Sequence, residues 1–426
     1  MGIFSGKILS NSLWMMLEKF IGIFGVIFVT SYVAKYIGPA NFGKIALATT
    51  IFTFVQTLTW FGNQEILFKR VSKNQNSGLQ YLFNTQGLRK VLFLVFSIPI
   101  LAILYVYSDL LTLIFATATA IATYFLTQDV HVIYNNATLN SYINAIVNMT
   151  GLSVALIIRY IIVALQMDYA YLAVPIILVT LIPYLLKNFI FNRNHKAQKI
   201  IATRYQKYYF WAGGALVISS LAVSFYTQIT SLMLTALTST HELGIYATAV
   251  TIGSAWSFIN FSIITSVLSK VYREKEDYES YNIVFKLNLV ICAVSFSVIA
   301  TLALFGQWII DVLYGEAYQD AYRLLIILAI STMFSGLGTI AARLMIKEES
   351  YAYISKKMLF VALSALPVAY AMIHIYGLIG AAYSVLIIEF LSLTVFNYFY
   401  KGGLIFKIHL FPFFKNSLKN EVIGKE

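Results

Sequence analysis

The chain has 426 residues, of which 59% are hydrophobic and 11% are charged, and its mean hydropathy is +0.77. Soluble proteins of this length form two or three domains and carry roughly 25% charged residues. So few charges cannot cover such surfaces, which excludes soluble enzymes, nucleic-acid-binding proteins and secreted disulfide scaffolds. The composition indicates a membrane protein with several spans. The net charge of +12 fits this class, because Lys and Arg collect in cytoplasmic loops.

Apolar runs long enough to cross a bilayer, about 20 residues of helix, recur along the whole chain. In the first half they predict the helices Ile8–Ile37, Phe42–Phe68, Val91–Tyr107, two within Leu110–Leu165, and Tyr169–Phe191. Gly38-Pro39 separates the first pair, and the polar segment Asn135–Asn140 separates the fourth helix from the fifth. The first helix lacks a small-residue cleavage site after a short apolar core, so we expect it to be retained.

The second half follows a basic segment, Asn192–Lys207, and predicts six more helices. They are Tyr208–Leu237, Leu243–Ser269, Leu287–Gln307, Leu324–Ile346, Met358–Ile375 and Leu378–Tyr400. The last two meet at Gly377. We therefore predict an all-α integral membrane protein with 12 transmembrane helices.

The basic residues alternate between the two sides of this topology. Of the 30 Lys and Arg residues, 25 fall on the side of the termini, three fall on the other side and two lie within spans. Because positive residues concentrate in cytoplasmic loops, we predict that both termini are cytoplasmic.

An internal repeat accompanies this pattern. Shifting the chain by 201 residues places Gly43–Ile51 over Gly244–Ile252 with five identities in nine positions, and it places Lys69 over Lys270. We therefore predict two six-helix lobes related by a repeat. The N-terminal lobe covers residues 1–191, a cytoplasmic basic connector covers 192–207, the C-terminal lobe covers 208–400 and a cytoplasmic basic tail covers 401–426.

Four motifs stand in order along the chain. They are Ala34–Gly43, which reads Ala-Lys-Tyr-Ile-Gly-Pro-Ala-Asn-Phe-Gly, then Trp60–Arg70, Leu313–Tyr318 and Tyr376–Tyr383. Together they resemble bacterial polysaccharide repeat-unit flippases of the Wzx type, within the multidrug/oligosaccharidyl-lipid/polysaccharide exporter superfamily. One departure is Lys35, where that family more often has arginine.

The resemblance implies a transporter rather than an enzyme. Its cargo would be an undecaprenyl-diphosphate-linked oligosaccharide, moved by alternating access from the cytoplasmic to the outer leaflet of the bacterial inner membrane, for O-antigen (lipopolysaccharide) or another surface polysaccharide. The implied partners are this lipid-linked oligosaccharide, membrane lipids, and the glycan polymerase and chain-length regulator of the same pathway, with no nucleic acid. No cofactor is expected besides a proton or sodium gradient.

Charges inside predicted spans are functional candidates, because they are costly to bury in a bilayer. Glu389 lies near the middle of the last helix, as an ion-coupling carboxylate, a glycan hydrogen-bond acceptor or half of a structural pair. Asp129, close to Gln128 and His131, is a second coupling candidate unless it is solvated at the interface. Glu18 is a third.

Lys19 and Arg159 are the two cations within predicted spans and are candidates for contact with a diphosphate. Alternatively, their side chains reach out to the membrane interface. Gln56, Gln228 and Asn260 fall in the middle of spans, where they either line a sugar cavity or hydrogen-bond within the helix bundle.

Two other functions stay open. An ion-coupled multidrug-type exporter of the same superfamily would share the fold. A membrane glycan polymerase or ligase commonly carries its catalytic residues in a long outer loop, whereas the longest predicted outer connection here is about 16 residues, Trp308–Arg323. No metal-ligand spacing, phosphate-binding glycine loop or nucleophile motif occurs in the sequence.

Overall fold

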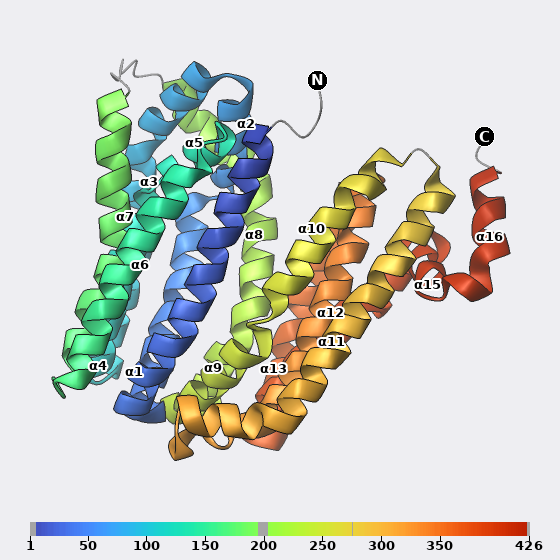
Figure 1. Ribbon diagram of the computed structural model, residues 1–426. Coiled ribbons are helices and arrows are strands. Elements are labelled where there is room, and N and C mark those ends of the chain that lie inside the picture. The colour runs from blue at the N-terminus through green and yellow to red at the C-terminus, as the bar shows by residue number, and fades with distance from the viewer. Residues whose placement is uncertain (1–5, 195–202, 275, 424–426) are drawn as a thin grey trace. The chain divides into compact units, whose positions relative to one another are not determined.

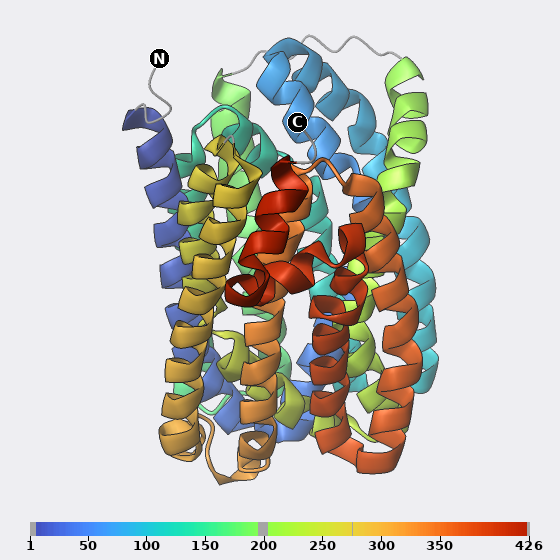
Figure 2. The same ribbon diagram turned by 90° about the vertical axis from the view of Figure 1, so that its right-hand side faces the viewer.

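The computed structural model describes residues 6–194, 203–274 and 276–423, and these are almost entirely helical (Figures 1 and 2). The chain divides into two compact units, Met1–Phe225 and Tyr226–Glu426. In the described residues nine helices are long and apolar enough to cross a membrane, or up to ten if one bent pair counts as a single span. An all-α chain with many membrane-spanning helices is thereby confirmed.

The first unit contains eight α-helices and one short 3-10 helix. They are α1 (Gly6–Trp60), α2 (Asn63–Lys73), α3 (Gln75–Tyr107), α4 (Leu110–Gln128), α5 (His131–Ala137), α6 (Ser141–Ala164), η1 (Tyr169–Leu172), α7 (Ala173–Asn194) and most of α8 (Thr203–Leu237). α1 packs against α3, α4 and α6, and α7 packs against α4 and α6. Fully buried Ala116 and Ala155 leave room for these helices to approach closely.

α1 consists of two helices joined at Gly38. This residue has φ 75° and ψ 167°, a conformation open to glycine because it has no Cβ. Pro39 follows and cannot donate the backbone hydrogen bond that would continue the first helix. Figure 1 shows that the chain reverses its direction within α1. The break predicted at Gly38-Pro39 is therefore present.

The predicted helix Phe42–Phe68 is wrong in one respect, because it is interrupted. Phe61 and Gly62 have φ values of 48° and 71°, and a bend of 48° separates α1 from α2. A Cβ at Gly62 would lie 2.5 Å from the Leu216 Cβ of α8, so the backbone needs a glycine at this close approach. Polar residues follow Gly62 directly, from Asn63 to Glu65, but the apolar residues on both sides of them led to the prediction of one continuous helix.

Most helices extend beyond the apolar runs that predicted them. α3 begins at Gln75 rather than Val91, because the Asn74 side chain caps it by accepting a hydrogen bond from the Ser77 backbone N–H at 3.1 Å. A search for apolar runs finds only the part of a helix that lies in hydrocarbon. The helical turns that consist of polar residues, beyond that part, were therefore missed.

The second unit begins with the end of α8. Its further elements are α9 (Thr240–Ser254), α10 (Ser257–Arg273), α11 (Asp277–Leu313), η2 (Glu316–Tyr318), α12 (Ala321–Lys347), α13 (Tyr351–Leu393), α14 (Val395–Tyr398), η3 (Tyr400–Gly402), α15 (Leu404–His409) and α16 (Phe411–Ile423). α12 contacts α9, α10, α11 and α13. The predicted helix Leu243–Ser269 corresponds to α9 and α10, which are separate helices.

α13 also consists of two helices, joined at Gly377 with φ 57° and ψ −133°, where the sequence predicted the boundary. The two segments lie so close that a Cβ at Gly380 would overlap the Met372 carbonyl group. The glycines of the Tyr376–Tyr383 motif therefore allow a tight turn between the two helices.

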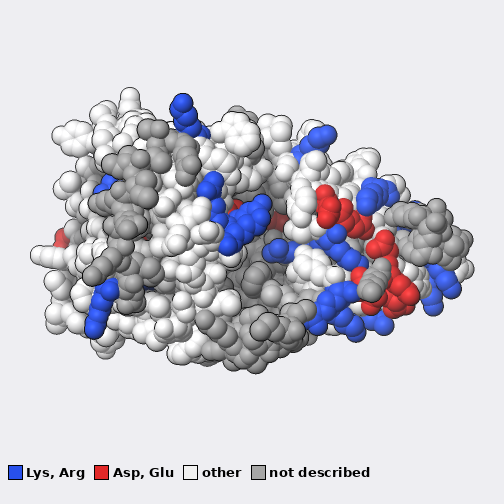
Figure 3. All heavy atoms as spheres, turned by 90° about the horizontal axis from the view of Figure 1, so that it is seen from above, with Lys and Arg blue, Asp and Glu red and all other residues white. Residues whose placement is uncertain are grey.

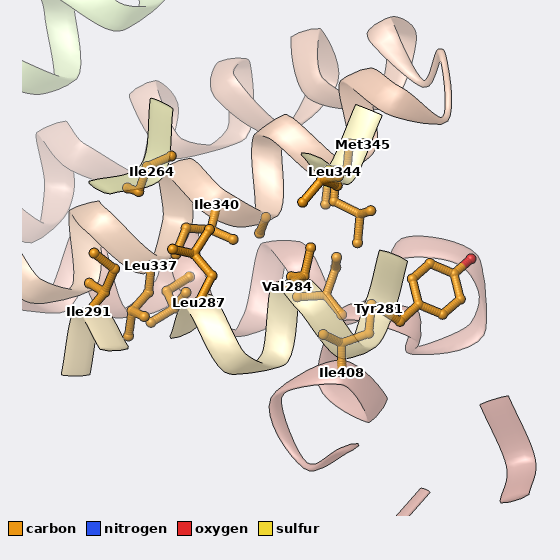
Figure 4. Close-up of a cluster of buried hydrophobic side chains, with 14 of the residues drawn as sticks. Ile264, Tyr281, Val284, Leu287, Ile291, Leu337, Ile340, Leu344, Met345 and Ile408 are labelled. Carbon is orange, nitrogen blue, oxygen red and sulfur yellow. The ribbon is translucent and has the colours of Figure 1, made fainter. Parts of the chain in front are cut away.

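The apolar core of the second unit lies where α10, α11, α12 and α15 meet, as Figure 4 shows for side chains such as Ile264, Leu287 and Leu344. Residues 401–426 were predicted as a basic tail, but they include α15 and α16. These helices pack against α11 (Figure 2), and their buried residues include Phe411 and Leu418.

Helix boundaries in the first unit recur in the second unit about 201 residues later. The helix after Gly38 begins at Pro39 and α9 begins at Thr240; α2 ends at Lys73 and α10 at Arg273; α3 begins at Gln75 and α11 at Asp277. These offsets of 201, 200 and 202 residues agree with the internal repeat in the sequence.

Candidate functional site

The second unit contains a cavity of about 450 Å³ between α8, α9, α10, α12 and α13. This volume lies in the range of about 300–1,000 Å³ that is usual for small-molecule sites. Its polar lining consists mainly of hydroxyl groups, including those of Ser254, Ser257, Ser331, Thr332, Ser335 and Ser384. Hydroxyl groups both donate and accept hydrogen bonds, so this wall suits water or a ligand rich in hydroxyl groups.

Glu389 is the one charged residue among the described residues that line this cavity. It lies in the second segment of α13, and both Glu389 and Ser335 of α12 line the cavity. Lys357, in the first segment of α13, acts on it electrostatically. A carboxylate held in this way can bind a proton, a cation or a sugar hydroxyl group.

Lys357 was not among the predicted site residues, because it was counted with the 25 basic residues on the side of the termini. Its side chain is buried, with 5% exposure, because α13 begins at Tyr351 and Lys357 lies almost two turns inside it. The apolar run that starts at Met358 directly after it is the signal that could have placed this lysine in the helix.

Asn260 of α10 lines the same cavity. Only 2% of its surface is exposed, and neither its amide nitrogen nor its amide oxygen has a hydrogen-bond partner in the described structure. A Cβ at Gly336 of α12 would lie 3.1 Å from the amide nitrogen, so the glycine makes room for the asparagine. The cavity therefore offers a ligand one donor and one acceptor that the protein leaves unused.

The other predicted polar residues do not join Asn260 and Glu389 here. Gln228 of α8 is half-buried but does not line the cavity, and Gln56 of α1 belongs to the first unit, where it is also half-buried. The backbone of Glu18 and Lys19 lies in α1, but their side chains fall outside the described residues.

Asp129, the second coupling candidate, lies in a buried cluster of the first unit. The Lys187 Nζ of α7 donates to Asp129 Oδ2 and to Asn148 Oδ1 of α6, at 2.7 Å each. Side-chain exposure is 1% for Lys187 and 8% for Asp129, so the predicted alternative of interfacial solvation is wrong. Lys187 was counted among the 25 basic residues on the side of the termini, but α7 places its side chain in the interior of the unit.

Arg159 lies on α6 in the first unit. Its Nη1 reaches the Thr30 hydroxyl oxygen of α1 at 3.5 Å, and no Asp or Glu of the described chain forms an ion pair with it. Most of the N–H groups of this guanidinium are therefore available to another acceptor.

A family model described as "Polysaccharide biosynthesis protein" matches residues 32–323. The chain belongs to this family. The match confirms the resemblance to polysaccharide flippases that the sequence motifs indicated. One curated relative is the capsular polysaccharide biosynthesis protein CapF of Staphylococcus aureus, which is 27% identical over 190 residues. That alignment covers 44% of this chain and 48% of the relative, so it spans about half of each protein.

Solved structures of two kinds of transporter share this fold. The lipid II flippase MurJ in an inward closed conformation matches with a TM-score of 0.70 and 15% identity, over 94% of this chain and 90% of its own. An inward-facing multidrug resistance MATE family transporter of the MOP superfamily matches with a TM-score of 0.63 and 13% identity, over 96% of both chains. An outward-facing transporter of that MATE family matches with a TM-score of 0.60 and 14% identity, over 97% and 96%.

Proposed function

We propose that this protein flips undecaprenyl-diphosphate-linked oligosaccharide repeat units from the cytoplasmic to the outer leaflet of the bacterial inner membrane by alternating access. The product would serve O-antigen or another surface polysaccharide. The observation that carries the proposal is the hydroxyl-lined cavity, with the unused amide of Asn260, in a chain of the polysaccharide biosynthesis protein family. Sugars are bound through their hydroxyl groups, and this wall offers matching donors and acceptors.

The proposal includes a topology of 12 membrane-spanning helices with both termini cytoplasmic, in two lobes of six. The breaks at Gly38 and Gly377 support this number, because each divides one continuous helical segment into two. Figure 3 shows Lys and Arg side chains on the end of the helices that carries α2 and α5, as expected of a cytoplasmic face.

Glu389 is the proposed coupling residue. Directed transport needs differential binding of an ion in the two access states. Glu389 lies on the cavity wall and shares the interior of its unit with Lys357, so gain of a proton or cation would change the charge balance where cargo binds. Asp129, which is already paired with Lys187, is the reserve candidate.

An experiment in cells tests the proposed activity. We expect deletion of the gene to leave lipid-linked repeat units on the cytoplasmic leaflet, where glycan-modifying enzymes added outside spheroplasts cannot reach them. The intact gene on a plasmid should restore their exposure. Normal surface polysaccharide in the deletion strain would contradict the proposal.

A multidrug-type exporter is the second candidate, because the fold also matches MATE transporters and a carboxylate in a cavity can bind organic cations. Transport of a fluorescent organic cation by the purified protein, with no exposure of lipid-linked glycan, would favour it. The hydroxyl-rich wall of the cavity supports transport of a glycan instead.

A further inference from the structure

Arg89 of α3 is a cation buried in the first unit, with 2% of its surface exposed. Its Nη1 donates to the Thr85 hydroxyl oxygen at 2.8 Å, one turn earlier on α3. Its Nε and Nη2 have no acceptor in the described structure. The guanidinium carbon lies 5.6 Å from the centre of the Trp60 ring. A guanidinium group is always charged in proteins, so this position holds a full positive charge with unused donors.

Further unused donors lie at the end of α1, on Trp60 and on the residue before it. The Trp60 indole N–H and the Thr59 hydroxyl group are buried and have no partner in the described residues. Water could satisfy such donors one by one, but it would not neutralise the arginine. An anion would do both, because its oxygen atoms accept hydrogen bonds from several donors at once.

A second arginine, Arg70 of α2, extends this group of donors toward the surface. It is half-buried, and its guanidinium carbon lies 4.4 Å from the ring centre of Tyr208 and 5.0 Å from that of Tyr81. Its Nε is also unused. Both arginines act electrostatically on Tyr81, so the two cations lie close to the same side chain.

No carboxylate in the described structure balances these charges. Neither arginine forms an ion pair with an Asp or Glu, and the groups that act electrostatically on Arg89 are the phenols of Tyr81, Tyr184 and Tyr209. A buried cation without a counterion is strongly unfavourable. The arrangement is therefore rich in donors and lacks an acceptor.

The position of Arg89 along α3 indicates where an anion would come from. Lys90 beside it is exposed, and the next turn carries Val91, Leu94 and Val95 with exposures of 58%, 49% and 56%. α3 therefore changes from polar to lipid-facing directly after Arg89. The anions that are abundant at this level of a membrane are the phosphate groups of lipids.

We propose that Arg89 and Arg70 form a binding site for the phosphate group of a lipid, with Arg70 at the accessible end and Arg89 at the inner end. The planar, forked guanidinium group matches the geometry of phosphate oxygens. The lipid is either an anionic phospholipid of the leaflet or a prenyl diphosphate. The site does not depend on the proposed function, since a phospholipid would bind here whatever the cavity of the second unit transports.

The test measures lipid-dependent thermal stabilisation of the full-length protein in a neutral detergent. Phosphatidylglycerol, phosphatidylcholine and farnesyl diphosphate are titrated separately, and the midpoint of each rise in Tm gives an apparent Kd. Arg89→Gln is compared with Lys90→Gln, which removes the same charge from the neighbouring, exposed position. Arg70→Gln and Arg89→Lys serve as further variants if Arg89→Gln does not fold.

We expect phosphatidylglycerol or farnesyl diphosphate to raise the Tm of the parent, and phosphatidylcholine to have little effect. Arg89→Gln should weaken the apparent Kd at least about tenfold, whereas Lys90→Gln should stay within about twofold. A response to phosphatidylglycerol alone identifies a phospholipid site, and a response to farnesyl diphosphate alone identifies a prenyl diphosphate site. The proposal is overturned if the parent responds to neither lipid, or if Arg89→Gln responds as the parent does.

Discussion

Asn260 carries a buried amide group that no described side chain satisfies. Such a group costs about 1–3 kcal/mol of stability, so a residue kept only for structure should not remain in this state. We predict that Asn260→Leu leaves the free energy of unfolding unchanged or raises it by about 1 kcal/mol, and lowers glycan flipping. Thermal unfolding and a flipping assay on the same preparation measure the two effects.

Asn144 of α6 is the matched control for this substitution. It is equally buried, but its amide nitrogen donates to the Val132 carbonyl at 3.0 Å and to Asn136 Oδ1 at 2.9 Å, and its oxygen accepts from Asn135. Asn144→Leu should therefore destabilise the fold. If Asn260→Leu destabilised it as much, Asn260 would be a structural residue.

The sequence could predict charges and amides in the middle of apolar runs, and Asn260 and Glu389 were found in this way. It could not predict buried cations at the edge of a run. Lys187 and Arg89 each lie beside a polar residue, so the sequence does not show whether they belong to a loop or to a buried part of a helix. Burial there is decided by packing between helices that are distant in the sequence.

The Lys187–Asp129 ion pair joins elements of the first unit, because it links α7 to the C-terminal end of α4 and, through Asn148, to α6. Removing one partner leaves the other buried and unpaired. We expect Asp129→Asn to cost about 3–5 kcal/mol of unfolding free energy, and Lys187→Met combined with it to recover much of that loss. A double-mutant cycle from thermal unfolding measures the coupling. Additive effects of the two substitutions would show that the pair is not linked in this way.

The α15–α16 segment should respond to pH through His409. Burial lowers the pKa of His409 from 6.5 to about 4, and Nδ1 lies 3.1 Å from the Tyr398 hydroxyl oxygen. The folded segment therefore keeps His409 neutral, while the undocked segment binds a proton below pH 6.5. As pH falls from 6.5 towards 4, the docked state loses stability.

We predict that hydrogen-exchange protection of α15 falls between pH 7 and pH 5, after correction for the intrinsic exchange rate. Protection of α12 in the same molecule is the internal control. His409→Gln should remove the pH dependence of α15. If the variant kept it, another group would be responsible.

Helix breaks were predictable where the sequence itself forbids a helix. Gly38-Pro39 and Gly377 are of this kind, and both breaks occur where expected. The break at Phe61-Gly62 could not be predicted in this way, because it depends on the close approach of α8 at Leu216. The helical extensions of α3 and α11 into polar sequence also escaped prediction, since a criterion based on apolar runs ends at the first charge.

For the whole molecule, the topology makes a direct prediction. In a Cys292→Ala background, single cysteines at Ser108 and Ser239 should react with an impermeant thiol reagent added to intact cells. A cysteine at Asn194 should react only after the membrane is opened. Labelling of the Asn194 position in intact cells would reverse the proposed orientation.

Flipping by the purified protein is the decisive measurement. Proteoliposomes carrying a fluorescent undecaprenyl-diphosphate oligosaccharide are given a pH gradient, and the fraction of glycan exposed to an added glycosidase is followed with time. We predict faster exposure with the parent than in protein-free vesicles, and a rate that depends on the gradient. Glu389→Gln should lose that dependence, whereas Asp320→Asn, an exposed acidic residue of the same unit, should keep it. Exposure no faster than in protein-free vesicles would contradict the proposed function.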